Sequence, residues 1–240
     1  NKWDFDYSKY HIVNGCKLSD EQMKIVENIC KYNVCILNGA GGTGKSFCTQ
    51  AVINMLKDNN KSFRLFSPTG KAAKVLSDYT KEHAMTIHRG LGYMPPDTWS
   101  FNENHKLDCD VLIIDEFSMT DIFLFKRVLD AVDFNRTKLL MIGDNAQLPS
   151  VSCGNLLHDF MQSNVIPTVT LTKVFRYGEG GLMKVATDVR FCKEYLTDIK
   201  NQFTWFGTNK DYAFVNVGSD IMVKNAVALY SKLLSQGYKV

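Results

Sequence analysis

Short apolar runs alternate with longer segments of mixed polarity along most of this 240-residue chain. Short runs of this kind are typical of strands buried on both faces of a parallel sheet, and the segments between them have the apolar spacing of helices. The pattern predicts an α/β fold, with a parallel sheet and helices on both faces. The predicted strands cover residues 34–37, 63–66, 111–114 and 138–142, and the predicted helices cover 20–29, 47–56, 123–132 and a segment that begins near Gly70.

Three stretches depart from this rhythm. Residues 1–17 form an N-terminal extension with a weak, strand-like alternation of aromatic residues, which we expect to pack on a neighbouring domain. Residues 91–110 contain two prolines and read as a loop or small hairpin inserted before the next core strand. After residue 190 the pattern changes again, with a predicted strand at 212–217 and a helix at 221–234.

Composition excludes some classes of protein. Hydrophobic residues make up 45% and charged residues 22%, which is ordinary for a globular domain. No apolar run reaches the ~20 residues needed to span a bilayer, and no signal peptide opens the chain, so we expect no membrane partner. The seven cysteines follow no pairing or metal-binding pattern and indicate reduced thiols in the cytoplasm. A net charge of +3 permits a polyanionic partner without requiring one.

The residues Gly39-Ala-Gly-Gly-Thr-Gly-Lys-Ser46 carry the most specific chemistry. They match the phosphate-binding pattern G-x-x-x-x-G-K-[ST], and they lie between a predicted strand and a predicted helix, as that pattern requires. Glycines in such a loop let backbone amides point at phosphate oxygens, and the helix N-terminus adds a positive dipole. We therefore predict a nucleoside triphosphate site. Its residues are Gly39, Gly42, Thr43, Gly44, Lys45, which neutralises the β- and γ-phosphates, and Ser46, which binds Mg²⁺.

Carboxylates follow the strand at 111–114. We predict that Asp115 holds hydrated Mg²⁺ and that Glu116 takes a proton from the attacking water. Such a pair by itself is equally typical of a solvated turn, but the phosphate loop upstream favours the catalytic interpretation. Gln147, after the strand at 138–142, can bond both a γ-phosphate and its attacking water, although residues 143–149 also fit a simple Asp-Asn turn.

Two polar clusters have the ingredients of nucleic-acid phosphate contacts, namely hydroxyls, cations and helix N-termini. The first is Ser-Pro-Thr-Gly-Lys-Ala-Ala at 67–73, with Thr69 and Lys71, and the second is Thr-Ile-His-Arg at 86–89. Either cluster alone is more typical of a helix cap.

Read in order, these segments resemble the motif series of superfamily 1 DNA helicases, especially the RecD-like and phage Dda-like branch that moves 5′→3′. The matching segments are Leu-Ser-x-Glu-Gln at 18–22, the phosphate loop at 39–46, residues 67–73, 86–89, 115–119 and 143–149, and Leu-Thr-Lys-Val-Phe-Arg-Tyr at 171–177.

The resemblance implies roles for individual residues. Gln22 would read the adenine edge and favour ATP, Gln147 would link the γ-phosphate to bound DNA, and Arg176 would stabilise charge on the γ-phosphate. Thr69, Thr86 and His88 would contact single-stranded DNA. Residues 18–190 would form the RecA-like motor lobe, and 89–106 a pin-like insert that separates strands. In that insert, Trp99 and Phe101 either stack on a base or pack against the insert itself.

The family has a second RecA-like lobe with a late motif, T-x-H-K-x-Q-G, that this chain lacks. We therefore expect residues 191–240 to lead into that second lobe, and the chain, which begins with Asn, to be part of a longer protein. The complete protein would be an ATP-dependent helicase of the exodeoxyribonuclease V alpha type. Its partners would be single-stranded DNA, duplex junctions, the second lobe and other recombination or replication subunits.

Other phosphate-loop proteins fit less well. A GTPase needs N-K-x-D, whereas here Asp211 directly follows Lys210. A nucleotide kinase has no use for an acid pair with a glutamine sensor, nor for two DNA-type clusters. A non-catalytic, ATP-gated lobe that binds single-stranded DNA remains the alternative.

Overall fold

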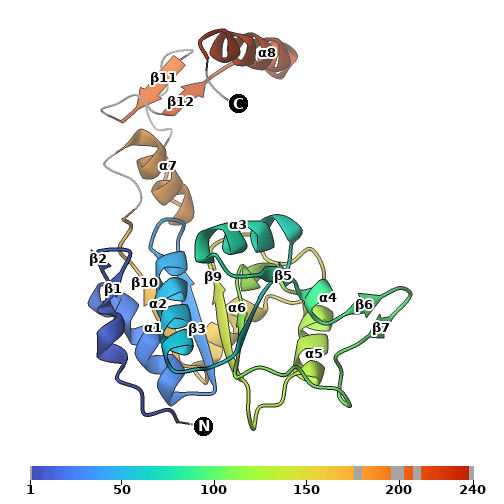
Figure 1. Cartoon of the computed structure of the whole chain (residues 1–240). Coiled ribbons are helices and arrows are strands. Elements are labelled where there is room, and N and C mark those ends of the chain that lie inside the picture. The colour runs from blue at the N-terminus through green and yellow to red at the C-terminus, as the bar shows by residue number, and fades with distance from the viewer. Residues whose placement is uncertain (1, 176–179, 196–202, 208–211, 238–240) are drawn as a thin grey trace. The chain divides into compact units, whose positions relative to one another are not determined.

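The structure is a computed structural model that describes residues 2–175, 180–195, 203–207 and 212–237 (Figure 1). The chain forms two compact units, residues 1–176 and 177–240. The division falls before the boundary near residue 190 that the sequence suggested, because helix α7 (Gly181–Arg190) packs closely on strand β11 (Phe203–Phe206) of the second unit. A Cβ on Gly181 would lie 2.1 Å from the carbonyl carbon of Phe206.

The first unit contains a six-stranded sheet in the order β10-β3-β9-β8-β4-β5, and every neighbouring pair is parallel (Figure 1). The predicted α/β fold is thus confirmed. Both edge strands were missed, because they are short and carry threonines among their apolar residues. The strands are β3 (Val34–Gly39), β4 (Phe63–Ser67), β5 (Ala84–Thr86), β8 (Val111–Ile114), β9 (Lys138–Gly143) and β10 (Thr168–Leu171).

Helices cover both faces of the sheet, because successive strand residues point to opposite sides. Leu37 and Ile113 join one buried cluster with helices α1, α2 and α3. Ile36 and Leu112 join the other, with α4, α5 and α6. The helices are α1 (Asp20–Lys31), α2 (Lys45–Asp58), α3 (Gly70–Thr80), α4 (Ile87–Gly90), α5 (Ile122–Ala131) and α6 (Leu156–Ser163), and a 3₁₀ turn, η2 (Phe117–Met119), follows β8.

The N-terminal segment differs from its prediction. It forms a 3₁₀ turn, η1 (Tyr7–His11), and a small hairpin of β1 (Ile12–Val13) and β2 (Cys16–Lys17). Its aromatic residues pack on the buried cluster under α1 and α2, whereas the sequence suggested packing on a neighbouring domain. Trp3 accounts for much of this: its amide donates to Cys30 O, and its ring lies 4.7 Å from the buried Lys138 ammonium. The aromatic alternation therefore reflects packing within this unit.

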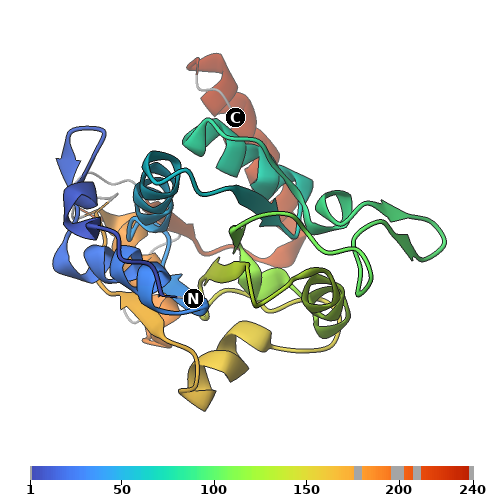
Figure 2. The ribbon, with the colours of Figure 1, turned by 60° about the horizontal axis from the view of Figure 1, so that its bottom comes forward.

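The insert before β8 contains a two-stranded antiparallel hairpin, β6 (Tyr93–Met94) and β7 (Thr98–Trp99). In both ribbon views it projects away from the sheet (Figures 1 and 2).

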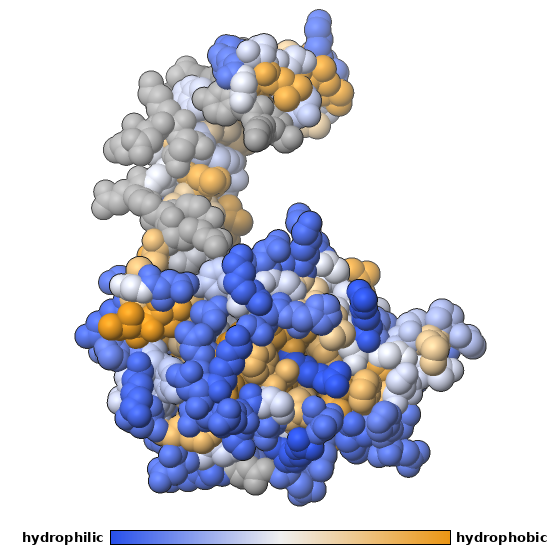
Figure 3. All heavy atoms as spheres, viewed as in Figure 1, coloured by the Kyte–Doolittle hydropathy of each residue, from blue (hydrophilic) through white to orange (hydrophobic). Residues whose placement is uncertain are grey.

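The second unit contains α7, the antiparallel pair β11 and β12 (Tyr212–Val215), and helix α8 (Ser219–Ser235). The predicted strand at 212–217 and helix at 221–234 are confirmed with shifted ends. None of the residues of α8 is buried, and apolar side chains are visible along it (Figure 3). In the part of the chain that the structure describes, no helix has the length and apolar character to cross a membrane.

Candidate nucleotide and nucleic-acid site

The segments that carry the predicted chemistry meet at one edge of the sheet. All six strands are parallel, so the residues that follow them emerge at the same carboxyl edge, where such sheets bind ligands. The segments are residues 39–44 after β3, 115–116 after β8, 144–149 after β9, 68–69 after β4, 87–90 after β5 and 172–175 after β10.

The phosphate loop needs its glycines for conformation and for space. Gly42 and Gly44 have φ of 81° and 92°, the left-handed region that glycine adopts readily. A Cβ on Gly44 would lie 2.3 Å from Gln22 Nε2, and one on Gly39 would lie 2.6 Å from Thr43 Oγ1. A side chain at position 44 would press on Gln22 of α1, and one at position 39 would press on Thr43 within the loop and on Leu171 of β10.

Lys45 is the first residue of α2, and its ammonium folds back over the loop. Nζ donates to Gly39 O at 2.7 Å and to Ala40 O at 3.2 Å. The ammonium thus lies with the helix N-terminus, which places two sources of positive potential together. An anion at the loop could take over the bonds that Nζ makes to these carbonyls, as a phosphate oxygen would.

Two carboxylates, Asp115 and Glu116, follow β8, and the second of them has an unusual backbone conformation. Asp115 N donates to Phe66 O at 2.9 Å, which continues the pairing with β4. Glu116 has φ 54° and ψ 39°, a left-handed conformation that costs a non-glycine residue about 1–3 kcal/mol. Its Oε2 is buried without a hydrogen-bond partner among the described residues. A carboxylate oxygen held in this way is available to accept a proton from water.

Burial, and after it the neighbouring charge of Glu116, raises the pKa of Asp115 to about 6, although the Glu116 amide and the Lys45 ammonium act in the opposite direction. A cation bound beside this carboxylate would favour its ionised form. Carboxylate and hydroxyl oxygens suit Mg²⁺, and Ser46, in the first turn of α2, supplies a hydroxyl. The residues present therefore fit the predicted metal.

Gln22 is 3% exposed and already bonded at both ends of its amide. Its Oε1 accepts from Ser19 N in the predicted capping box of α1, and its Nε2 donates to Thr43 O at 3.1 Å. The side chain thus joins the start of α1 to the phosphate loop. Its role in reading adenine stays a prediction, with one amide hydrogen left for a base.

The turn after β9 carries Gln147. Its amide donates to Asp144 O at 3.0 Å, and Ala146 N donates to Asp144 Oδ1 at 3.1 Å. Gln147 is exposed and Asp144 is buried. This Asp-anchored turn presents the glutamine side chain outward, at the same edge as the phosphate loop.

Arg176 lies outside the described residues. The residue before it is placed, however: Phe175 N donates to Gly42 O at 2.8 Å. The segment after β10 therefore touches the phosphate loop directly, a contact that the sequence did not reveal.

The hydroxyls of the two DNA-type clusters act as helix caps. Thr69 Oγ1 accepts from Ala72 N at the start of α3, and Thr86 Oγ1 accepts from Arg89 N at the start of α4. Lys71 is exposed in the first turn of α3. The capping interpretation thus holds for both threonines, and their DNA contacts stay a prediction.

The aromatic residues of the insert pack on the protein. The Trp99 ring lies 4.8 Å from that of Tyr93 and 5.6 Å from that of His88, between ring centroids. The Arg127 guanidinium lies 5.5 Å from the Trp99 centroid. The ring of Phe101 stacks on His105, with Arg64 5.1 Å from its centroid. Stacking on a base, which stays a prediction, would require one of these neighbours to move.

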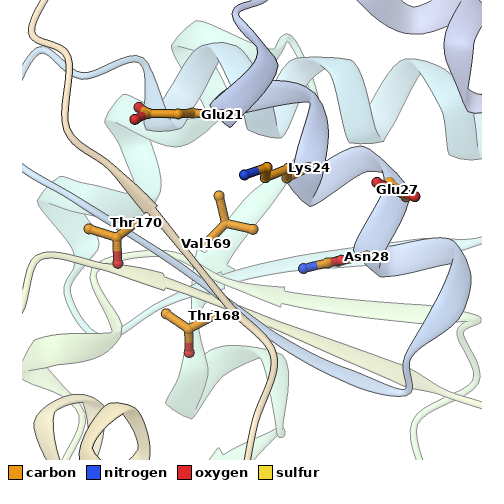
Figure 4. A pocket seen from close by; sticks show the side chains of 7 residues that line it. All are labelled: Glu21, Lys24, Glu27, Asn28, Thr168, Val169 and Thr170. Atoms are coloured by element: carbon orange, nitrogen blue, oxygen red, sulfur yellow. The ribbon is translucent and has the colours of Figure 1, made fainter. Parts of the chain in front are cut away.

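A separate cavity of about 340 Å³ lies between α1 and the edge strand β10 (Figure 4). Glu21, Lys24 and Glu27 line it from α1, and an acidic lining of this kind does not favour a triphosphate. At its upper end Glu21 accepts from Thr172 N at 3.0 Å and from Thr172 Oγ1 at 2.7 Å, which anchors the segment that leads to Phe175.

Residues 17–193 match the protein family described as "AAA domain", which is well over half of the chain. The chain belongs to this family. It is 38% identical over 161 residues to the ATP-dependent RecD2 DNA helicase of Deinococcus radiodurans, covering 66% of this chain and 22% of that protein. It is 36% identical over 146 residues to the RecBCD enzyme subunit RecD of Buchnera aphidicola, covering 52% of this chain and 24% of that protein.

Solved helicase structures share the fold. The Pif1 helicase of Candida albicans superimposes with a TM-score of 0.56 at 23% identity, over 73% of this chain and 44% of that chain. The Bacteroides Pif1 helicase, in a complex with ADP-AlF3 and single-stranded DNA, gives 0.53 at 19% identity, over 94% and 58%. The resemblance to RecD-like helicases is confirmed, and the chain spans about a quarter of the length of the curated relatives it matches.

Proposed function

We propose that this chain is the nucleotide-binding motor lobe of an ATP-dependent DNA helicase that moves 5′→3′ on single-stranded DNA. The single observation that carries the proposal is the meeting, at one sheet edge, of a phosphate loop and a buried carboxylate oxygen that has no hydrogen-bond partner within the described part of the chain. Lys45 folds over that loop, and the oxygen belongs to Glu116. The similarity to proteins named RecD2 DNA helicase and RecBCD subunit RecD supports the assignment to a helicase.

In this proposal each residue has one task. The loop amides and Lys45 hold the β- and γ-phosphates of ATP. Glu116 accepts the proton of the water that attacks the γ-phosphorus, while the bond to the bridging oxygen breaks and ADP leaves. Mg²⁺, held by Ser46 and Asp115, would neutralise phosphate charge when bound. Gln147 orients the attacking water, and Arg176 neutralises charge on the γ-phosphate.

DNA would run over the carboxyl edge. Thr86 ends strand β5 and His88 follows it, while Thr69 and Lys71 follow the neighbouring strand β4. The β6–β7 hairpin that carries Trp99 would act as the pin at a duplex junction. Residues 177–240 would begin a second RecA-like lobe. The active helicase would consist of both lobes, together with other recombination or replication subunits.

The test is ATP hydrolysis by the full-length protein with and without single-stranded DNA, beside its Glu116→Gln variant. We expect DNA to stimulate hydrolysis in the wild type. We expect the variant to bind nucleotide within a few-fold of the wild type but to turn over roughly 10²–10⁴ times more slowly. Binding of ATP and DNA without any hydrolysis would favour the non-catalytic, ATP-gated lobe. A rate of ATP hydrolysis that is the same with and without DNA would favour an unrelated NTPase.

A further inference from the structure

A buried amide lies at the end of the strand that leads into the phosphate loop. Asn38 follows the apolar residues of β3, directly precedes Gly39 and is 2% exposed. Burying an amide is unfavourable unless its polar atoms are bonded. The hydrogen bonds of Asn38 therefore indicate why a polar residue stands there.

The side chain of Asn38 reaches the strands on both sides of β3. Asn38 is in register with Gly143 of β9 and with Thr170 of β10. Its Oδ1 accepts from Asn145 N at 3.0 Å, a distance typical of a strong amide hydrogen bond. Its Nδ2 lies 3.5 Å from Thr170 Oγ1, at the outer limit for such a bond. The contact with Asn145 is the stronger of the two.

Asn145 begins the turn that presents Gln147. The next two amides of the turn, those of Ala146 and Gln147, are held from within it by Asp144. The bond from Asn145 is different, because its acceptor belongs to the strand that ends at the phosphate loop. It connects the turn to the residue next to Gly39, a place where nucleotide binding is expected to act.

We propose that Asn38 is a positioning residue that holds the turn 143–149, and with it Gln147, against the phosphate loop. A change in the loop on nucleotide binding then reaches Gln147 through one side chain. The inference rests on the proposed function, since it assigns Gln147 a partner in the same reaction. Asn38 itself contacts neither nucleotide nor water in this scheme.

The bond can be tested without catalysis, by amide hydrogen exchange on this 240-residue chain. In Asn38→Ala we expect the Asn145 amide to exchange at least about tenfold faster, while the amides of β8 report any global loss of stability. The matched control is Thr170→Val, which removes the other contact of Asn38 and leaves the Asn145 bond in place. Unchanged exchange at Asn145 in Asn38→Ala, or an equal increase in β8, overturns the proposal.

The consequence can be tested in the full-length protein by a double-mutant cycle with Gln147→Ala. We expect Asn38→Ala to lower the DNA-stimulated kcat about tenfold with the KM for ATP within about twofold, and to have no further effect in the Gln147→Ala background. An equal loss in both backgrounds, or a change in KM alone, contradicts a role through Gln147. If the wild type shows no DNA-stimulated hydrolysis, the proposed function fails, and the exchange experiment still decides whether Asn38 holds the turn.

Discussion

Replacing Asp115 by Asn is expected to change how stability depends on pH. Burial, joined by the charge of Glu116, raises the pKa of Asp115 from 3.8 to about 6 in the folded chain. The folded state therefore binds a proton more tightly than the unfolded state, so the unfolding free energy falls as pH rises between these two values. The shift corresponds to about 3 kcal/mol lost by neutral pH. An asparagine at this position does not titrate and escapes that loss.

The assay is chemical denaturation of this chain in the absence of nucleotide and divalent metal, for the wild type and for Asp115→Asn, between about pH 4 and pH 7.5. The unfolding free energy of the variant minus that of the wild type should grow by about 2.5 kcal/mol across this range, because part of the loss has already occurred at pH 4. Any effect of the asparagine side chain that does not depend on pH is the same at every pH, so it does not contribute to this change.

Asp110→Asn is the matched control, because its shift has the opposite sign. Burial alone would raise the pKa of Asp110, but hydrogen bonds from the Ser62 hydroxyl and amide outweigh burial and hold this pKa below its usual value. The ionised carboxylate of Asp110 stabilises the fold at pH values above the unfolded pKa. The unfolding free energy of Asp110→Asn should therefore fall relative to that of the wild type as pH rises. A stability difference for Asp115→Asn that stays constant with pH, or that follows the trend of Asp110→Asn, would refute the reasoning.

Four further substitutions, one of them a control, test the loop and the acid pair. Lys45→Ala should reduce nucleotide affinity at least about 100-fold by removing the ammonium that faces the phosphates, as measured by calorimetric titration. Gly44→Ala should destabilise the chain by about 1–3 kcal/mol and abolish nucleotide binding, because its φ is 92° and its Cβ would meet Gln22. Gly41→Ala is the control: nothing lies within 4 Å of the added Cβ, so this variant should keep the stability and the nucleotide affinity of the wild type. Thermal melts measure the stability of both variants, and calorimetric titrations measure their nucleotide binding. Glu116→Gln should raise stability in urea titrations at neutral pH, since Glu116 sits beside Asp115 and its charge raises the pKa of Asp115.

The sheet and the phosphate loop were predictable because local rules determine them. Apolar runs such as 111–114 are buried on both faces, and Gly42 and Gly44 adopt the backbone angles that the loop requires. Because the strands are parallel, the carboxylates that end one of them lie at the same edge of the sheet as the loop that ends another. No long-range information was needed for these expectations.

Contacts between distant segments could not be read from the sequence. The N-terminal aromatics were wrongly expected to face another domain, because an alternating pattern does not say which surface it covers. The bond from Phe175 to Gly42 and the bond from Asn145 to Asn38 join residues more than 100 positions apart. A polar residue ending an apolar strand is the signal that could have drawn attention to Asn38.

The most direct test of the site is a crystal structure of this chain with a nonhydrolysable ATP analogue and Mg²⁺. We predict the triphosphate against the amides of residues 39–44, with Lys45 Nζ turned from Gly39 O to the phosphates and both carboxylates at 115 and 116 facing the γ-phosphate. An empty loop, or carboxylates that face away from a bound nucleotide, would contradict the account.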